Sequence, residues 1–327
     1  MLGGNQMPEL PEVETVRRGL SQLVVGKTIK RVVVRWPRII ESPEVSVFCQ
    51  ELVGQVIEAV NRRGKYLIFQ LTDYDMVSHL RMEGKYEYFA QESLGESSQA
   101  QVSEAYSGSI SPEALGEYFE QDELGAFPVT KHTHVLFFFT DGSQLQYRDV
   151  RKFGRMALIP KGTAKEYKGI TRLGPEPLPE EFTLADFKVG LLKSHKAIKP
   201  LLLDQRLVTG LGNIYVDEAL WQAKIHPEQP SNTLSDGEIA TLRLAILDVL
   251  QRAVSAGGTT IRTYLNALGE AGKFQLSLNV YGQTGNPCPR CGTPIEKIKV
   301  AQRGTHFCPT CQKLRQRKAR VLRKVGK

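Results

Sequence analysis

Four cysteines near the C-terminus form the residue pattern that most directly specifies a chemistry. Two residues separate Cys288 from Cys291 and Cys308 from Cys311, and sixteen residues lie between the two pairs. Such spacing can place four thiolates tetrahedrally around one zinc ion, and four protein ligands leave no coordination position for a substrate. We therefore expect one structural Zn2+ ion held by these four cysteines.

The residues around the cysteine pairs favour a small β-hairpin finger with a basic surface. Glycines and prolines beside both pairs suit the tight turns of such a finger. Arg303 lies on the expected hairpin, and residues 286–327 hold twelve Lys and Arg against a single acidic residue. This charge would attract phosphate groups, although the residues after Lys313 are equally consistent with a solvated basic tail.

The whole chain is basic, as ribosomal or membrane-surface proteins also are, and its composition argues against membrane-spanning and secreted proteins. It has 327 residues, and 43 Lys and Arg against 35 Asp and Glu give a net charge of +8. A basic chain of this length fits two domains and a small module that together bind a polyanion. The sequence has no run of 18 apolar residues and no basic N-terminal segment followed by an apolar one. We therefore expect a cytoplasmic protein.

Hydrophobic periodicity predicts a mainly β first half. Apolar residues at helical spacing between Val13 and Leu23 predict one amphipathic helix after Pro11. The strand-like runs that follow cover 29–36, 66–72, 134–140 and 144–148. An Asp-Gly turn joins the last two runs, which is typical of a β-hairpin.

The second half has a helical pattern. A dense Pro/Gly stretch at 173–179 separates the halves, and we place a domain boundary there. A capping box at 235–238 begins a long helix, and Gly257-Gly258 ends it. Residues 91–130 differ from both halves, because they contain eight Asp and Glu, seven Ser and no Lys or Arg. This composition favours an inserted loop without a core of its own.

Several short motifs, taken in chain order, resemble those of the formamidopyrimidine-DNA glycosylase family. They are PELPEVETVRRG at 8–19, RRGKYL at 62–67, HLRM at 79–82, DVRKFG at 149–154, LGPEP at 173–177, GLGNIY at 210–215 and the four-cysteine finger. The resemblance covers residues 8–313. It implies a β-sandwich domain with a leading helix, a helix–two-turns–helix domain and a C-terminal zinc finger, with double-stranded DNA held between the domains.

Together, the residue patterns and the resemblance divide the chain into segments. The segments are an extension at 1–7, a catalytic β-sandwich domain at 8–172 with the acidic insertion at 91–130, a helix–two-turns–helix DNA-binding domain at 180–280, the zinc finger at 281–313 and a basic tail at 314–327. The fold class is therefore expected to be multidomain α+β.

Pro8 is the nucleophile that the resemblance implies. In the family, the secondary amine of the N-terminal proline attacks the sugar of the damaged nucleotide and forms an iminium (Schiff-base) intermediate. Because an iminium needs a free amine, we expect the active protein to begin at Pro8, without residues 1–7. Taken alone, Pro8 would be interpreted as a proline at a helix start.

Three further residues match catalytic positions of the family. Glu9 is implied to protonate the opening deoxyribose, Lys65 to assist β-elimination, and Arg303 to grip phosphate and assist δ-elimination. Without the resemblance, Glu9 would equally be an acidic residue that favours a helix N-terminus. Lys65 and Arg303 would then be ordinary surface charges.

The remaining matches concern DNA binding. A base inside a duplex must be flipped out before it reacts, and Met82, Arg151 and Phe153 match the residues that fill the space it leaves. Without the resemblance, Met82 and Phe153 would be core residues and Arg151 a surface charge. The positions implied to contact the DNA backbone are His132, Lys196, Asn213 and Tyr281, of which Asn213 is also a candidate N-cap and His132 a candidate structural histidine.

Three features depart from the family pattern. Residues 1–6 precede the proline motif, the acidic stretch is longer than the usual connection, and KSHK at 193–196 replaces a lysine-rich segment. Lys196 is therefore the best match for the backbone contact placed there. The lesion-recognition loop expected within Thr259–Asn279 also differs from the family pattern, which leaves the lesion preference open.

The predicted function is base-excision repair by a monomeric enzyme with one zinc ion. This DNA glycosylase and AP lyase would excise 8-oxoguanine and formamidopyrimidines from duplex DNA and cleave the strand by β,δ-elimination. An endonuclease VIII-type glycosylase for oxidised pyrimidines is one alternative, although PELPEV resembles the purine branch better. A non-catalytic zinc-finger DNA-binding protein is another, and it would need no free amine at Pro8.

Overall fold

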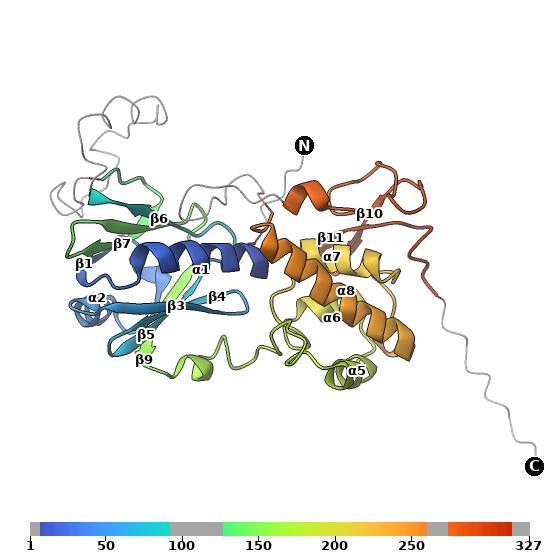
Figure 1. The fold of residues 1–327 in the computed structure, drawn as a ribbon, viewed down its shortest axis with the longest axis horizontal. Coiled ribbons are helices and arrows are strands. Elements are labelled where there is room, and N and C mark those ends of the chain that lie inside the picture. The colour runs from blue at the N-terminus through green and yellow to red at the C-terminus, as the bar shows by residue number, and fades with distance from the viewer. Residues whose placement is uncertain (1–6, 92–126, 260–273, 316–327) are drawn as a thin grey trace, which may run out of the picture. The chain divides into compact units, whose positions relative to one another are not determined.

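The chain folds into two units, whose helices and strands are labelled in Figure 1. The computed structural model describes residues 7–91, 127–259 and 274–315. Within these ranges, the first unit takes residues 1–172 and 253–275, and the second takes 173–252 and 276–327. The chain therefore leaves the first unit at the Pro/Gly-rich stretch and re-enters it at the end of a long helix.

Four of the segments for which the sequence gives predictions fall outside the described residues, wholly or in large part. They are the extension, the acidic insertion from 92 to 126, the recognition loop from 260 to 273 and the basic tail from 316 onward.

Two β-sheets form the framework of the first unit. The four-stranded sheet has the order β1 (Ile29–Val34), β7 (Thr133–Phe139), β8 (Gln144–Arg148) and β6 (Lys85–Phe89). The five-stranded sheet has the order β2 (Ile40–Ser42), β9 (Arg155–Pro160), β5 (Tyr74–His79), β4 (Tyr66–Leu71) and β3 (Ile57–Arg63). Neighbouring strands are antiparallel except β2 and β9. The four predicted strands correspond to β1, β4, β7 and β8, and each observed end lies within two residues of the prediction.

Both sheets contribute to one apolar core. Leu67 and Phe69 of β4, Phe137 of β7 and Tyr147 of β8 are all buried in it, because alternate side chains of each strand point to the same face. The helices α1 (Leu10–Val24) and α2 (Val45–Leu52) pack against β3 and β1 respectively. The first unit is therefore the predicted β-sandwich with a leading helix.

Helices dominate the second unit. They are α5 (Leu184–Leu192), α6 (Ile198–Leu203), α7 (Asn213–Gln222) and α8 (Asp236–Ser255), of which α8 ends in the first unit. The predicted capping box begins α8, since the Ser235 amide donates to Glu238 and the Glu238 amide donates to the Ser235 hydroxyl. Short 3-10 helices cover Pro37–Ile39, Ala164–Glu166, Ser231–Thr233 and Phe274–Ser277.

The finger is the predicted β-hairpin, formed by β10 (Glu296–Val300) and β11 (Arg303–Phe307). Together with the helices of the second unit and the sandwich of the first, it gives the α+β architecture that the motifs predict. Among the helices of the described ranges, none combines the length and the hydrophobicity that crossing a bilayer requires.

Candidate active site and metal centre

The four cysteines of the finger converge on one point. The Sγ atoms of Cys288, Cys291, Cys308 and Cys311 all lie within 4.8 Å of one another. Tetrahedral zinc with Zn–S bonds of about 2.3 Å requires sulfur atoms about 3.8 Å apart, so this cluster fits one zinc ion. The amide of Cys311 lies 3.4 Å from Sγ of Cys308, and such N–H groups stabilise thiolates. The geometry therefore supports a structural zinc site with four protein ligands.

A buried ion pair fastens the finger hairpin to the helices of the second unit. Nζ of Lys199 lies 2.7 Å from Oδ1 of Asp217, and both side chains are completely buried. The same Nζ donates to the Gly304 carbonyl at 3.2 Å, while Oδ2 of Asp217 accepts the His306 amide at 2.9 Å. Gly304 and His306 follow Arg303 in the hairpin, and Arg303 is exposed at the start of β11. The ion pair therefore fixes the strand that presents Arg303.

Asn213 and Tyr281 are held close to this hairpin. The N-cap of α7 is Gly212, so the N-cap interpretation of Asn213 is wrong by one residue. Nδ2 of Asn213 instead donates to the Gly304 carbonyl at 2.9 Å, and its Oδ1 is buried without a hydrogen-bond partner among the described residues. The ring of Tyr281 packs edge-on against His306 at 4.8 Å between centroids. Lys196, in contrast, is exposed after α5 and shares none of these contacts.

Glu218 is a further residue of this region that sequence reasoning missed. Its buried carboxylate accepts the amides of Asn279, Val280 and Tyr281 at 2.9 to 3.1 Å. Three amides on one carboxylate fix the backbone that leads into the finger. No local pattern signals this role, because the partners lie about 60 positions away.

Pro8 and Glu9 are both buried at the beginning of α1. Glu9 is the N-cap of α1, and its amide donates to Oε2 of Glu12 at 2.9 Å in a capping box. Oε1 of Glu12 accepts the amide and the hydroxyl of Thr259, at 2.8 and 2.9 Å. Glu12, which the sequence did not single out, therefore ties the helix start to the segment that follows α8.

Lys65 is a buried residue of a tight turn. It follows Gly64 between β3 and β4, and it is only 7% exposed. Gly64 has a φ of 57°, a left-handed conformation that favours glycine. The interpretation of Lys65 as an ordinary surface charge is therefore wrong.

Tyr147 brings together the two loops that carry Met82, Arg151 and Phe153. A Cβ added to Gly84 or to Gly154 would lie 2.0 or 1.8 Å from the hydroxyl of Tyr147, so both loops need glycine to pack against it. The Met82 loop and the Phe153 loop are thus neighbours around one buried phenol. The glycines of the 79–84 and 149–154 segments are the sequence signal that could have revealed this contact.

Asp149 shapes the loop of Arg151 and Phe153. Its two carboxylate oxygens accept the amides of Arg151 and Gly154 at 2.9 and 2.7 Å. The Arg151 guanidinium lies 4.8 Å from the centroid of the Phe153 ring, and Phe153 is 45% exposed. The interpretation of Phe153 as a core residue is therefore wrong, since an exposed aromatic ring here leaves its apolar surface in water.

Histidines and cations surround these loops. Burial, then the charges of Lys131, Arg148 and Lys152, lower the pKa of His132. Nδ1 of His79 accepts the Arg81 amide at 2.9 Å, which holds Arg81 in a left-handed conformation next to Met82. Burial is the main cause that lowers the pKa of His79 to about 3, so this ring is neutral and can accept.

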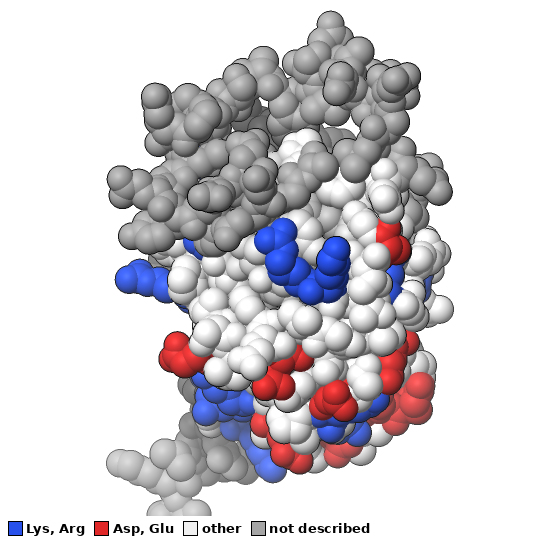
Figure 2. Space-filling view, turned by 90° about the vertical axis from the view of Figure 1, so that its left-hand side faces the viewer, with Lys and Arg blue, Asp and Glu red and all other residues white. Residues whose placement is uncertain are grey.

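One side of the first unit carries charges of both signs. Figure 2 shows the side that is on the left in Figure 1. In its coloured part, a wide uncharged area surrounds a few basic side chains in the middle, and basic and acidic side chains are intermixed in the lower half. This visible area therefore lacks a continuous basic patch of the kind that binds DNA phosphates.

Comparisons with known proteins agree with these features. Three family models match in chain order: the formamidopyrimidine-DNA glycosylase N-terminal domain at 7–156, its H2TH domain at 173–265, and the zinc finger found in FPG and IleRS at 285–314. The chain is 64% identical over 312 residues to the formamidopyrimidine-DNA glycosylase of Enterococcus faecalis, covering 95% of this chain and 99% of that one. For the Bacillus subtilis enzyme the identity is 50% over 307 residues, covering 94% and 99%.

Solved structures give the same result. A Lactococcus lactis FPG mutant in complex with a Fapy-dG containing DNA has a TM-score of 0.79 at 45% identity, covering 94% of this chain and 100% of that one. A complex of the Lactococcus lactis enzyme with an abasic site containing DNA also has a TM-score of 0.79, at 44% identity, covering 93% and 99%. The chain therefore belongs to the formamidopyrimidine-DNA glycosylase family.

Proposed function

We propose that this protein excises 8-oxoguanine and formamidopyrimidines from duplex DNA and then cleaves the strand by β,δ-elimination. Base-excision repair by a DNA glycosylase with AP-lyase activity is the function of the family to which the chain belongs. A solved relative binds DNA that contains Fapy-dG, which supports oxidised purines as the substrate class, and another binds DNA that contains an abasic site. The observation that carries the proposal is the placement of Pro8 and Glu9 at the capped start of α1.

Pro8 is the proposed nucleophile. Its secondary amine would attack the sugar carbon that bears the damaged base and form an iminium, with release of the base. In a chain that keeps Met7, the Pro8 nitrogen is a tertiary amide whose lone pair is delocalised into the carbonyl, and it cannot attack. The proposal therefore requires an active form that begins at Pro8.

Three side chains would handle the protons and phosphates of the later steps. Glu9, which directly follows the amine, would protonate the opening deoxyribose. Lys65, in its buried turn, would assist β-elimination by proton transfer, and Arg303 on β11 would bind the phosphate that leaves in the δ-elimination.

The remaining residues would bind and distort the DNA. Met82, Arg151 and Phe153 would fill the space left by the flipped nucleotide, and their loops already lie together around Tyr147. His132, Lys196, Asn213 and Tyr281 are the proposed contacts to the DNA backbone. The four cysteines would hold one zinc ion that stabilises the finger and takes no part in the chemistry. We also propose that the enzyme acts as a cytoplasmic monomer.

Covalent trapping tests this proposal. Borohydride reduction of the iminium should join the protein to lesion-containing DNA, and mass spectrometry should place the link on Pro8 of a chain that begins there. A variant that verifiably keeps Met1–Met7 is the control and should not be trapped. Efficient trapping of that longer chain would show that another amine, such as Lys65, is the nucleophile.

Substrate comparison tests the lesion class. Duplexes with 8-oxoguanine should be processed faster than duplexes with thymine glycol under single-turnover conditions. The opposite ranking would favour the endonuclease VIII-type alternative, and binding without either reaction would favour a non-catalytic zinc-finger protein.

A further inference from the structure

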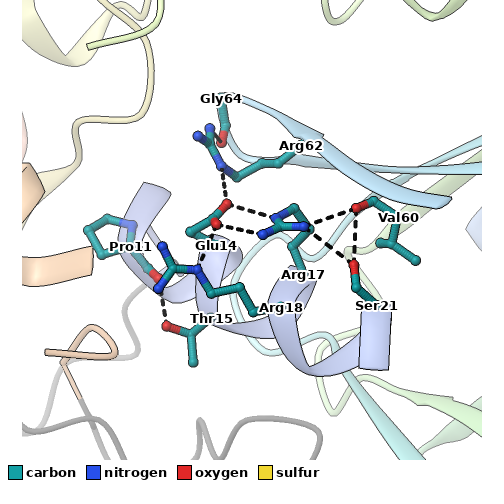
Figure 3. Close-up of polar contacts among 9 residues, drawn as sticks. All are labelled: Pro11, Glu14, Thr15, Arg17, Arg18, Ser21, Val60, Arg62 and Gly64. Carbon is teal, nitrogen blue, oxygen red and sulfur yellow. Dashed lines mark hydrogen bonds and ion pairs between the residues drawn. The ribbon is translucent and has the colours of Figure 1, made fainter. Parts of the chain in front are cut away.

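One carboxylate joins the helix that begins two residues after the proposed nucleophile to the hairpin that carries Lys65. Figure 3 shows Glu14 of α1 surrounded by the guanidinium groups of Arg17, Arg18 and Arg62. Nε and Nη2 of Arg17 donate to its two oxygens at 3.0 and 2.9 Å, and Nε of Arg62 donates to Oε2 at 3.1 Å. The Glu14 side chain is only 13% exposed, so water screens these contacts weakly.

Arg62 extends this contact to the turn of Lys65. Arg62 lies in β3, and its Nη1 donates to the Gly64 carbonyl at 2.9 Å while its Nε is held by Glu14 (Figure 3). The Gly64 carbonyl belongs to the peptide bond that leads directly into Lys65. A short chain of contacts therefore runs from Glu14 through Arg62 to the backbone of Lys65.

Arg17 makes a second contact from α1 to β3. Its Nη1 lies 3.3 Å from the Val60 carbonyl, which also accepts the Ser21 hydroxyl at 3.3 Å. Glu14 holds this guanidinium in place through two parallel hydrogen bonds, the most directional form of ion pair. Because α1 is rigid and begins immediately after Glu9, fixing α1 against β3 also fixes the position of Pro8 and Glu9.

The charge state of Glu14 suits this task. Burial by itself would raise the pKa of its carboxyl, but hydrogen bonds from Arg17 and the charges of Arg17 and Arg62 outweigh burial and lower it. The carboxylate is therefore ionised at neutral pH, and the contact does not switch with pH in the neutral range.

We propose that Glu14 is a positioning residue that, through Arg62, sets the place of the Lys65 turn relative to the helix start with Pro8 and Glu9. This inference rests on the proposed roles of Pro8 and Lys65. Glu14 touches neither reacting group, and its effect would pass through the backbone of Lys65. Its loss should therefore slow the elimination step that Lys65 assists more than it weakens DNA binding.

Two variants test the link, and a third is their matched control. Glu14→Gln keeps the size of the side chain but removes the charge, and Arg62→Gln removes the donor to Gly64. Arg18→Gln removes a partner that donates to the same carboxylate at 2.9 Å but has a 54% exposed side chain. Single-turnover strand cleavage at a pre-formed abasic site should fall about tenfold in the first two variants, a change of about one decade in rate. It should stay near wild type in the control.

A double-mutant cycle separates positioning from general damage. If Glu14 acts through Lys65, Glu14→Gln should have little further effect in a Lys65→Ala background, whereas independent roles would give multiplied losses. Melting temperature and DNA affinity are measured for each variant, so that unfolding is recognised directly. Arg62→Gln provides the same test if Glu14→Gln folds poorly.

The outcomes distinguish a failure of this inference from a failure of the proposed function on which it rests. A non-additive cycle with a slow Glu14→Gln variant supports positioning. Additive losses, or a Glu14→Gln variant as active as Arg18→Gln, would overturn the inference while leaving Lys65 and Pro8 in their roles. A Lys65→Ala variant as active as wild type would overturn the proposed role of Lys65 itself.

Discussion

The sandwich and the finger support their exposed functional side chains by different physical means. In the first unit, the loops of Met82 and Phe153 pack on Tyr147, which belongs to an apolar core that two sheets and two helices share. The finger contributes Cys288, Ile295 and Cys308 to a small apolar cluster that also includes Trp221 and Val280. The cluster is too small to stabilise the finger alone, and the four cysteine ligands and the Lys199–Asp217 ion pair supply the remaining stability.

This difference shows how the size of a module decides which interactions can stabilise its fold. A sandwich buries enough apolar surface to stabilise itself, and its polar contacts are free to set the geometry of loops. A finger of about 30 residues cannot do so, and its fold depends on metal binding and on charge pairs excluded from water. Loss of the metal or of a buried charge pair should therefore destabilise the finger much more than the sandwich.

Loss of a zinc ligand should give the largest effect. Replacing Cys308 by Ser removes one of four ligands from a site whose apparent binding free energy is typically about 10–16 kcal/mol. We expect loss of zinc and of duplex binding together, while the sandwich keeps its own thermal transition. Metal analysis, fluorescence anisotropy with duplex DNA and calorimetry measure these three quantities.

Cys49→Ser is the control for this experiment, because Cys49 packs against the sandwich core and lies outside the ligand set. A Cys308→Ser variant with full zinc content and normal DNA binding would contradict the comparison of the two regions.

Breaking the buried ion pair should have the next largest effect. Asp217→Asn leaves the Lys199 charge buried without its partner, which typically costs about 3–5 kcal/mol of stability. Urea unfolding of the zinc-loaded protein measures this loss, and DNA affinity should fall with it because the Arg303 strand loosens. Asp248→Asn is the matched control, since the Asp248–Arg252 pair is surface-exposed and should contribute less than about 1 kcal/mol. Equal losses in both variants would contradict the role given to the buried pair.

Shortening Phe153 should affect activity without affecting the sandwich. Phe153→Ala should slow excision from an intact lesion duplex on the order of tenfold or more, equal to at least about 1.4 kcal/mol. Cleavage at a pre-formed abasic site should fall much less, because no base must then be extruded. Val150→Ala changes a neighbouring exposed apolar residue of the same loop and should leave both rates near wild type. Equal losses on both substrates would argue against a void-filling role.

The smallest effect should be a pH dependence of sandwich stability that comes from His79. Burial and the charges of Arg81 and Lys65 lower its pKa from 6.5 to about 3. Above pH 6.5 the ring is neutral in both states; below it, only the unfolded chain gains a proton, and the free energy of unfolding falls until about pH 3. This loss should reach about 1.4 kcal/mol near pH 5.5.

Urea unfolding at neutral and mildly acidic pH measures this dependence. His79→Gln keeps an acceptor for the Arg81 amide and should show a weaker loss on acidification than wild type. His195→Gln changes an exposed histidine of the other unit and should behave as wild type. An unchanged acid response in His79→Gln would assign the pH dependence to other groups.

Local patterns predicted the elements of this fold well. The strands β4 and β8 and the capping box of α8 follow from neighbouring residues, because alternation, turn chemistry and capping act over a few positions. The burial of Lys65 and the exposure of Phe153 did not follow from these patterns. Burial depends on what covers a residue, and the covering residues come from distant segments.

The sequence by itself determined the family, the order of the segments and the four cysteines of the metal site, since these are carried by residue types at fixed short spacings. Only the tertiary structure revealed Tyr147 between two loops, Glu218 beneath Tyr281, and the chain of contacts from Glu14 to the Lys65 turn. Glu14 and Arg62 are 48 positions apart, and a side-chain hydrogen bond needs its partners within about 3 Å. Only the packing of α1 against β3 brings these two side chains within that distance.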